Sequence, residues 1–550
     1  MNWSFFFTLN QRRHTILQVV IGLVFCLTPI FINLPYKINL YLAWEGAYRM
    51  SIGQMPFRDF GMPLGYGFWI IPSVFFKIFG PWMSSLIKAQ AFINALSLVS
   101  FHYILKALKV DNSLRTIGIL IFCISYIFIH FWPWYNHTVF MYELIGMALL
   151  LNSVTQKGYK RYILLVLSGV MIFLSFFTKQ DIGGLAFLFG LIIATTSAIY
   201  ERDVRVVVFF LGGFILAFAL FVLPLLQYDF SYWFNFGQPP HSSRISLMDY
   251  LDDTFGVGSN LLRVYLLLIF VRIFMLLQSD FKAFINDKHQ VLLVLVTLGF
   301  VVQALLAQVT SYIPANAHYY YHSFAVVFLL SSVKIEKYLY QPVSLLVICA
   351  LIVFTWSNDF WKYGRRIVNR LNPTKEVLDY SRVSKKTWII KNDTLKRDRS
   401  DWVNPPYKTF DNVTLPKSTV EGIGRLVGTY KGKKDLKVLN MTELPQLAHE
   451  LGYEPLKGAE QPLWYHQSVA FFDREVSTIC DNISKEHYDL VLFEIIPELN
   501  RFYPPDVLRC AKENYELEDY IEEILFNEFH TVAEDGSLPK VSEIHSSFIF

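Results

Sequence analysis

The side chains best suited to chemistry lie in short polar segments between long apolar runs. The first such segment, residues 35–65, contains Glu45 and Asp59 together with Arg58. A positioned carboxylate can take or deliver a proton, and a nearby cation can neutralise negative charge that develops during a reaction. This segment is therefore a candidate site for acid–base chemistry on an anionic ligand. A helix-capping or loop-ordering role for the two carboxylates stays open.

Four later polar segments repeat these side-chain types. They hold Asn136 and His137 in WPWYNH, Lys179 and Asp181 in TKQD, His241 and Arg244 in HSSR, and His318 and His322 within residues 310–323. The TKQD turn is too short to be a solvated excursion, so we expect Lys179 and Asp181 at the mouth of a helix bundle. His318 and His322 would share one face of a helix and could orient a ligand or bind a metal. For each segment alone, a hydrated turn in an aromatic belt is the simpler alternative.

The elements that carry these segments have the composition of membrane helices. Hydrophobic residues make up 53% of the 550 positions and charged residues 17%, against roughly 25% charged residues in an average soluble protein. Beyond residue 357 no apolar run reaches the roughly 20 residues that cross a bilayer. We therefore predict a polytopic body over residues 1–357 and a water-soluble domain over residues 358–550. The formal net charge of +4 and the absence of a basic cluster interleaved with aromatics give no reason to expect a nucleic-acid partner.

The apolar runs predict a multi-span α-helical bundle of about 11 transmembrane helices. The expected spans are 15–34, 84–105, 116–132, 138–154, 162–178, 184–200, 206–226, 259–277, 291–309, 323–333 and 342–357. The run from Tyr66 to Phe79 is short and contains Lys77, so we expect a surface or re-entrant helix there.

Basic residues alternate between the loops and predict the orientation. They occur before the first span (Arg12, Arg13) and then in every second loop: Lys106, Lys109, Arg115, Lys157, Lys160, Arg161, Arg202, Arg205, Lys282, Lys288, Lys334 and Lys337. The positive-inside rule places this set in the cytoplasm. We expect an integral protein of the bacterial inner membrane, with a cytoplasmic N-terminus and an extracytoplasmic domain at residues 358–550.

The C-terminal region has the pattern of a small α/β domain. LKVLNM and YDLVLFEI are typical of buried strands, and PQLAHELG of a helix ending at Gly452. P-loop, GxSxG, HExxH and CxxC motifs are absent from the sequence. Cys480 and Cys510 could form a disulfide in an oxidising compartment, or remain buried thiols.

The first polar segment resembles the corresponding loop of the GT-C superfamily of membrane glycosyltransferases. Its start, Trp44-Glu45-Gly46-Ala47-Tyr48, is similar to the Asp-Glu-x-x-Tyr of bacterial relatives of the protein O-mannosyltransferases and of the aminoarabinose lipid A transferases. Its end, Phe57-Arg58-Asp59-Phe60 leading to Gly65-Tyr66, is similar to their closing stretch. Two departures stand out: Trp44 replaces the leading Asp, and Gly61-Met62 replaces the Glu-Lys pair before the proline.

The resemblance covers residues 15–357 and implies transfer of a hexose or pentose from a polyprenyl-phosphate-linked donor to a lipid, glycan or protein acceptor on the outer face of the membrane. If the missing leading Asp is the essential carboxylate of the family, its catalytic role must move to Glu45 or Asp59, or activity is lost. The family's phosphate-binding lysine is missing as well, and we expect Lys179, followed by Arg58, to take its place. The remaining substrate-binding candidates are Tyr48, Asn136, His137, Asp181, His318 and His322. A divalent metal as a cofactor stays open, and so does a structural Lys179–Asp181 pair that only anchors the turn.

Two other classes of protein remain alternatives. The first is a polytopic transporter or lipid flippase with an extracytoplasmic partner-binding domain, which Glu143, Arg263 and Arg272 within the spans would suit. The second is a scaffold without enzymatic activity. A scaffold would not need the carboxylates of residues 35–65 or the charged TKQD turn.

Overall fold

The structure is a computed structural model. It describes residues 8–31, 34–35, 40–127, 132–228, 230–234, 247–256, 260–311, 320–333, 335–355, 402–458, 463, 469, 471–494, 503–521 and 547–549. His241, Arg244 and His318 lie outside the described residues, as does the start of the expected soluble domain.

The chain divides into two compact units that are discontinuous in sequence. Unit 1 contains Met1–Pro29, Gln90–Pro224 and His241–Gly364, and unit 2 contains Ile30–Ala89, Leu225–Pro240 and Arg365–Phe550. The boundary expected at residue 357 does not describe this division, because residues 30–89 belong with the C-terminal region rather than with the helical body.

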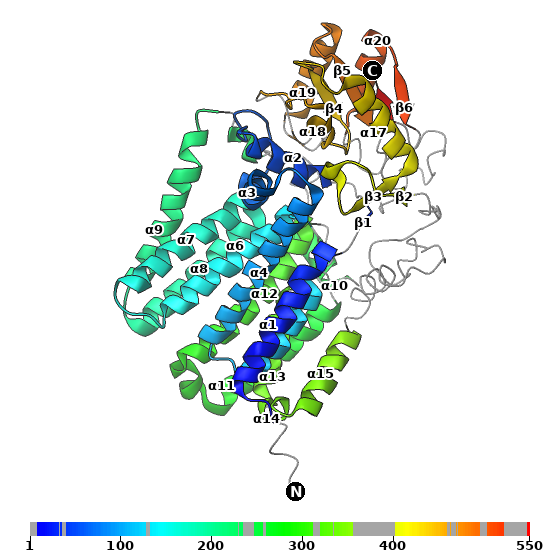
Figure 1. Cartoon of the computed structure of the whole chain (residues 1–550). Coiled ribbons are helices and arrows are strands. Elements are labelled where there is room, and N and C mark those ends of the chain that lie inside the picture. Colours follow the sequence, from blue (N-terminus) through cyan, green and yellow to red (C-terminus); the bar gives the residue numbers. More distant parts are fainter. Residues whose placement is uncertain are drawn as a thin grey trace. The chain divides into compact units, whose positions relative to one another are not determined.

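Unit 1 is built of helices that run beside one another (Figure 1). They are α1 (Gln11–Leu27), α4 (Met83–Ala107, which begins in unit 2), α5 (Asn112–Phe122), α6 (Tyr135–Ser153), α7 (Tyr159–Thr178), α8 (Gln180–Glu201), α9 (Arg205–Phe221), α10 (Leu247–Phe255), α11 (Asn260–Asn286), α12 (Lys288–Ser311), α13 (Tyr320–Ser332), α14 (Glu336–Leu339) and α15 (Pro342–Thr355). Helices satisfy their own backbone hydrogen bonds, which is the requirement for spanning hydrocarbon.

Each expected span overlaps one of these helices. Among the described residues, six helical segments are long and apolar enough to cross a membrane: Gln11–Phe31, Tyr159–Thr178, Gln180–Glu201, Arg205–Leu225, Asn260–Ser279 and Lys288–Ala307. The number of crossings, about 11, stays a prediction. The expected short helix is present as a 3-10 turn at Tyr66–Trp69 followed by α3 (Ile70–Phe79).

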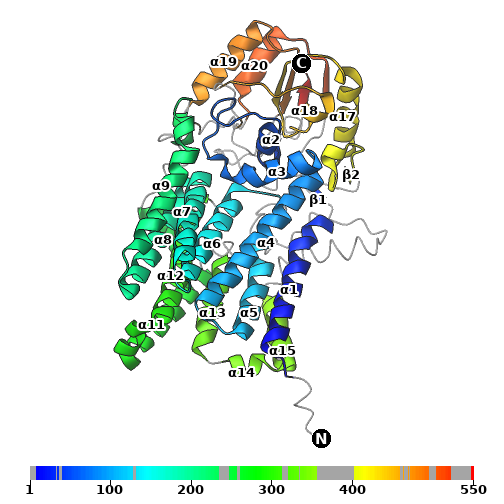
Figure 2. The ribbon, with the colours of Figure 1, turned by 60° about the vertical axis from the view of Figure 1, so that its left-hand side comes forward.

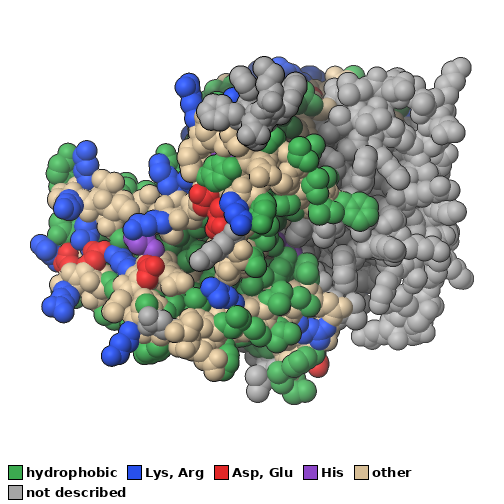
Figure 3. All heavy atoms as spheres, turned by 90° about the horizontal axis from the view of Figure 1, so that it is seen from below, with side chains coloured by type: hydrophobic (Ala, Val, Ile, Leu, Met, Phe, Trp, Pro, Cys, Tyr) green, Lys and Arg blue, Asp and Glu red, His purple; other side chains and the backbone are tan. Residues whose placement is uncertain are grey.

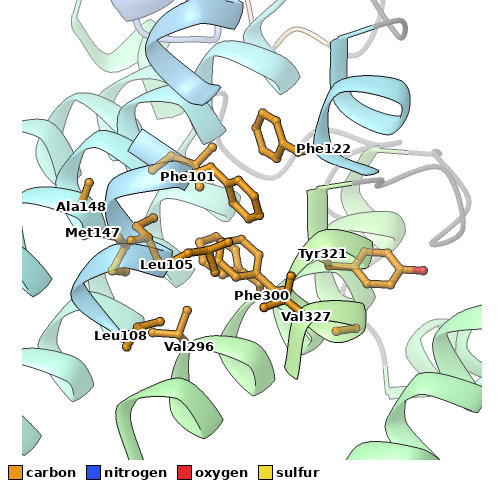
Figure 4. Packing of buried hydrophobic residues seen from close by; sticks show 14 of the residues in the cluster. Phe101, Leu105, Leu108, Phe122, Met147, Ala148, Val296, Phe300, Tyr321 and Val327 are labelled. Carbon is orange, nitrogen blue, oxygen red and sulfur yellow. The ribbon is translucent and has the colours of Figure 1, made fainter. Parts of the chain in front are cut away.

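Aromatic and branched aliphatic side chains form the core of unit 1. Phe101 of α4 stacks on Phe122 of α5 with ring centroids 4.7 Å apart, and Phe300 of α12 stacks on Phe324 of α13 at 4.2 Å. Figure 4 shows Phe101, Phe122 and Phe300 converging from separate helices. Such stacked pairs stabilise packing beyond the area that they bury.

One end of unit 1 is rich in basic side chains. Figure 3 looks onto this end and shows Lys and Arg side chains spread over it. Glu201, at the end of α8, pairs with Arg161 of α7 and with Lys288 of α12, while Asp203 pairs with Arg205 at 2.8 Å. These ion pairs connect three helices where the chain leaves the apolar region. The side of the membrane that this end faces stays a prediction.

Unit 2 contains two small sheets and the helices around them. Its helices are α2 (Leu40–Ser51), α3, α17 (Lys417–Tyr430), α18 (Leu447–Leu451), α19 (Phe472–Ser484) and α20 (Pro505–Asn514). Its strands are β1 (Leu34–Pro35), β2 (Trp402–Val403), β3 (Val413–Pro416), β4 (Val438–Met441), β5 (Leu490–Glu494), β6 (Asp519–Ile521) and β7 (Ser547–Ile549). The strand orders are β1-β3-β2 and β4-β5-β7-β6, with β4 and β5 parallel.

The strands and the helix expected from the C-terminal sequence are present in unit 2. Strand β4 lies within LKVLNM, β5 within YDLVLFEI, and α18 within PQLAHELG. Gly452 ends α18 with φ +83°, a left-handed conformation that glycine adopts without steric cost.

Residues 30–89 join unit 2 through main-chain pairing. Strand β1 runs parallel to β3, with Leu34 opposite Val413. The Asn412 side-chain amide donates to the Ile30 carbonyl at 3.1 Å, and the Ser84 amide donates to the Asp411 carboxylate at 2.6 Å. These contacts join residues that are several hundred positions apart in the sequence, and they explain why the two segments form one compact unit.

Cys480 of α19 and Cys510 of α20 form a disulfide, 30 residues apart in sequence. The other three cysteines, Cys26, Cys123 and Cys349, are free thiols. Closing a loop of this length lowers the entropy of the unfolded chain and stabilises the fold by about 4 kcal/mol in the chain-entropy description.

Thiol labelling of the denatured protein tests this bond. Without reductant we expect an alkylating reagent to add to three cysteines, and after reduction to all five, as measured by intact mass. Five labelled cysteines in freshly purified, unreduced protein would contradict the disulfide.

Candidate functional site

Helix α2 carries the first group of candidate residues. Glu45 and Arg49 are one turn apart, which places both side chains on the same face of the helix. The Arg49 guanidinium donates to Glu45 Oε1 from Nε at 2.8 Å and pairs with the same oxygen from Nη2 at 2.7 Å. The Arg49 side chain is 6% exposed and that of Glu45 is 19% exposed. The carboxylate is therefore held by a buried cation but remains accessible.

Arg49 also binds two groups outside its own helix. Its Nη1 donates to Gln54 Oε1 at 3.3 Å and to the main-chain carbonyl of Leu456 at 2.8 Å. Its guanidinium lies over the Phe60 ring, 5.1 Å from the centroid. Arg49 was not among the residues predicted from the sequence, although its spacing of four residues from Glu45 is the signal that could have identified it.

A strap of C-terminal residues, Tyr453–Gly458 with Leu463, runs along residues 49–61. Gln54 Nε2 donates to the Pro455 carbonyl at 2.8 Å. The Gly458 amide donates to the Asp59 carbonyl at 2.8 Å, and the Leu463 amide donates to the Gly61 carbonyl at 2.9 Å. Figures 1 and 2 both show α2 beside α18, and the Tyr48 ring meets His449 edge-on at 6.2 Å. The C-terminal region thus forms one wall of the candidate site.

Asp59 orders the turn in which it lies. Its Oδ2 accepts from the Met55 amide at 2.7 Å and from Arg58 Nη2 at 2.6 Å. Burial alone would raise the pKa of Asp59, but the hydrogen bonds from Arg58 and Met55 and the charges of Arg58 and Lys457 outweigh it and hold that pKa below its usual value. The structure therefore shows the loop-ordering contacts that were the alternative to catalysis for this residue.

Arg58 is the exposed cation of this group. Its side chain is 42% exposed. The hydrogen bond to Asp59 raises the pKa of Arg58, with further contributions from Tyr228. It is a permanent positive charge with part of its surface open to solvent.

At the two positions that depart from the GT-C motif, Trp44 and Gly61, the residues pack against aromatic rings. Trp44 is fully buried, stacks on Tyr48 with ring centroids 4.8 Å apart, and packs at a tilt against Phe76 with centroids 5.7 Å apart. A Cβ on Gly61 would lie 2.5 Å from Cε2 of Tyr232, which is too close for any side chain unless the ring moves. At both positions an apolar contact stands where the motif has a charged residue.

Lys179 and Asp181 lie at the junction of α7 and α8 in unit 1. Lys179 is the single extended residue between the two helices, and its Nζ lies 3.0 Å from Asp181 Oδ2. A Cβ on Gly183 would lie 2.2 Å from the Phe176 Cα, so this glycine is required for the close approach of the two helices. The ion pair of the alternative interpretation is present, and binding of a phosphate by Lys179 stays a proposal.

The remaining candidates of unit 1 pack among aromatic rings. Tyr126 OH donates to the His137 carbonyl at 3.0 Å, and the two rings lie 3.8 Å apart. His322 is fully buried, 4.2 Å from the Tyr321 ring and 5.5 Å from the Tyr265 ring. Asn136 lies next to His137 in the first turn of α6.

The described residues contain no group of side chains that could coordinate a divalent metal ion. No three or more His, Cys, Asp or Glu side chains gather there in a group that could hold an ion. We therefore derive no step through a metal.

Glu143, which kept the transporter alternative open, has a structural contact. Gln303 Nε2 donates to Glu143 Oε2 at 2.9 Å and to the Ile182 carbonyl at 3.3 Å. These bonds connect α6, α12 and α8. Buried polar pairs of this kind hold membrane helices together.

Comparisons with known proteins identify the fold. No family model and no curated protein matches the sequence. The chain is similar in fold to solved structures that match nearly its whole length. The structures in question are those of ArnT from Cupriavidus metallidurans. The apo structure of ArnT matches with a TM-score of 0.53 at 11% identity. The structure bound to undecaprenyl phosphate matches with a TM-score of 0.51 at 10% identity, and each match covers 97% of both chains.

The contacts of Asp59 predict a pH-dependent contribution to stability. Because its folded pKa is lowered, its hydrogen bonds stabilise the fold above the unfolded pKa of about 3.9 and are lost as the pH falls through the folded value. Asp59→Asn should cost about 1.5–3 kcal/mol at pH 7, the range for hydrogen bonds to a charged group. The difference in melting temperature from the unsubstituted protein should shrink below about pH 4.

The matched control is Glu513→Gln, which removes an exposed carboxylate from α20 of the same unit. It should leave the melting temperature close to that of the unsubstituted protein throughout. A difference between Asp59→Asn and the unsubstituted protein that stayed constant from pH 7 to pH 3 would contradict the assignment.

Proposed function

We propose that this protein is a membrane glycosyltransferase that moves a sugar from a polyprenyl-phosphate-linked donor to a lipid, glycan or protein acceptor outside the cytoplasm. The observation that carries the proposal is the similarity in fold to ArnT over 97% of both chains. The structure of ArnT has been solved with undecaprenyl phosphate bound. The acidic and basic side chains of α2 and residues 55–61 supply the groups that this chemistry needs.

The reaction requires a base, a counter-charge and a lipid-accessible body. The acceptor hydroxyl attacks the anomeric carbon, the bond from that carbon to the phosphate oxygen breaks, and polyprenyl phosphate leaves. The proton of the hydroxyl passes to a carboxylate. Cations stabilise the negative charge on the departing phosphate.

Glu45 is the better placed of the two proposed catalytic carboxylates. Only its Oε1 is bound by Arg49, no hydrogen bond in the described structure uses Oε2, and the side chain is partly exposed. Asp59 has a lowered pKa and is therefore the weaker base. We assign proton transfer to Glu45, and to Asp59 the ordering of the loop and of Arg58.

Lys179 and Arg58 are the proposed ligands of the donor phosphate. Arg58 is exposed and remains charged, and a guanidinium suits the planar, bidentate recognition of phosphate oxygens. Lys179 is held at a helix junction by Asp181, so its ammonium is pre-positioned. Tyr48, Asn136, His137, Asp181, His318 and His322 stay proposed contacts to the substrates.

The proposed orientation places the N-terminus in the cytoplasm and residues 358–550 outside. The basic residues at one end of unit 1 support it through the positive-inside rule. The Cys480–Cys510 disulfide also supports it, because disulfides persist in oxidising compartments.

Transfer from a radiolabelled polyprenyl-phosphate sugar pool tests the proposal. We expect the purified protein to move label to an acceptor fraction of membrane extract. Glu45→Gln should lower the rate by about 10²–10⁴, the usual loss when a positioned base is removed. Asp59→Asn should lower it less, in proportion to the fraction of correctly folded loop. The control is Glu421→Gln, an exposed carboxylate on α17 whose loss should leave transfer unchanged. No transfer by the unsubstituted protein with any donor in the pool would sink the proposal.

The same preparations separate the two roles of Lys179. If Lys179 binds the donor phosphate, Lys179→Gln should weaken binding of undecaprenyl phosphate with little change in melting temperature. If Lys179 only anchors the turn through Asp181, the melting temperature should fall and binding by the folded fraction should be unchanged. The second result would remove Lys179 from the site.

A further inference from the structure

A small pocket lies between α2 and the C-terminal part of unit 2. It is lined by Glu45, Arg49, Val438, Leu439, Asn440, Pro445, Ala448, Tyr453, Pro455 and Leu456. Two of these residues come from the first outer segment and eight from the C-terminal region, so neither segment alone encloses it. Nothing in the sequence pattern marked this combination.

The polar wall of the pocket is already ordered. The Asn440 side-chain amide donates to the Leu444 carbonyl at 3.2 Å and to Tyr453 OH at 3.1 Å. Asn440 Oδ1 accepts from the Thr442 hydroxyl at 2.7 Å. The Tyr453 hydroxyl therefore has an assigned donor and keeps its own proton to offer. A ligand entering here would meet groups held in place beforehand, which lowers the entropy lost on binding.

Glu45 supplies the open acceptor. Arg49 holds Oε1 from one side and thereby fixes the carboxylate plane. In the described structure Oε2 has no hydrogen-bond donor, and the side chain keeps 19% of its surface exposed. An ionised carboxylate accepts hydrogen bonds only, so the complementary ligand group is a donor.

Strand β4 contributes a backbone edge to the same pocket. It is the terminal strand in the order β4-β5-β7-β6, and Val438, Leu439 and Asn440 line the pocket. A terminal strand presents backbone amides and carbonyls that no second strand uses. The residues of β4 thus add backbone donors and acceptors to the lining of the pocket.

The charges around the pocket cancel in pairs. Glu45 is neutralised by Arg49, and Glu454 pairs with Lys457 at 2.5 Å. In the described structure the Arg49 guanidinium donates to Glu45, Gln54 and Leu456, so little of its hydrogen-bonding capacity is left for an anion. A locally neutral site with an open acceptor favours an uncharged hydroxyl over a phosphate or an ammonium group.

We propose that this pocket binds a hydroxyl of a neutral, polyhydroxylated ligand and presents it to Glu45 Oε2. The inference rests on the proposed function in one respect: the ligand is then the acceptor, whose hydroxyl proton passes to Glu45 as its oxygen bonds to the anomeric carbon and polyprenyl phosphate leaves. The acceptor class is accordingly a carbohydrate-like hydroxyl rather than an amine or a charged headgroup. The C-terminal region selects it.

Equilibrium binding without donor tests the proposal. The probes are methyl glycosides of glucose, galactose, mannose and arabinose, compared with glucosamine and glucose 6-phosphate, added to the full-length protein in detergent and followed by saturation-transfer NMR and calorimetry. We expect at least one neutral glycoside to bind with a millimolar dissociation constant, more tightly than the amine or the phosphate. Glu45→Gln should weaken it about tenfold through loss of a charge-assisted hydrogen bond.

Two further variants keep the test independent of folding. Tyr453→Phe removes one hydroxyl from the pocket wall without changing charge and should also weaken binding. Glu421→Gln, on exposed α17, should not. Melting temperatures identify any variant that fails to fold, in which case the remaining variant decides. The proposal would be overturned if no neutral glycoside bound, if glucose 6-phosphate bound more tightly than every neutral glycoside, or if Glu45→Gln and Tyr453→Phe bound a glycoside as tightly as the unsubstituted protein does.

The outcome is separable from that of the transfer assay. Glycoside binding that depends on Glu45 and Tyr453, in a protein without transferase activity, would leave the pocket intact and sink the enzymatic proposal. Transferase activity together with glycoside binding that does not depend on Glu45 or Tyr453 would support the enzymatic proposal and overturn the proposed role of the pocket.

Discussion

The arrangement of unit 2 depends on the buried guanidinium of Arg49. Removing a cation from water is costly unless its donors are satisfied. Here Glu45, Gln54 and the Leu456 carbonyl accept from it, and Phe60 covers one face. Since these partners come from α2, the following turn and the C-terminal strap, satisfying one cation fixes three segments at once. Breaking any one of them leaves a buried charge partly unpaired, which disfavours intermediate arrangements.

Several features of the candidate site follow from this constraint. Glu45 is oriented with one oxygen bound and the other open. The strap that supplies the Leu456 carbonyl also supplies the amide of Gly458 to the Asp59 carbonyl, so the turn containing Arg58 is positioned from the same side. The C-terminal region is therefore a wall of the candidate site. The acceptor selection proposed above would use the residues of this wall.

The sequence predicted elements well and their association poorly. Apolar runs located the helices of unit 1 because a membrane span is a property of one continuous segment. The patterns of residues 436–441 and 488–495 predicted β4 and β5 for the same reason. The joining of residues 30–89 to the C-terminal region could not be seen, because it depends on main-chain groups such as the Leu456 carbonyl some 400 residues away. The same limit applies to position 61, where the Tyr232 ring leaves no room for any residue larger than glycine.

The most direct measurement of this account is amide hydrogen exchange on the full-length protein with Arg49→Lys. Lysine keeps the charge but cannot make the forked set of contacts. We predict that exchange rises together in residues 40–61 and 453–458, while the helices of unit 1, such as α7 and α12, keep their protection. Unchanged exchange in residues 453–458, or a uniform rise across both units, would contradict the claim that Arg49 ties the first outer segment to the C-terminal region.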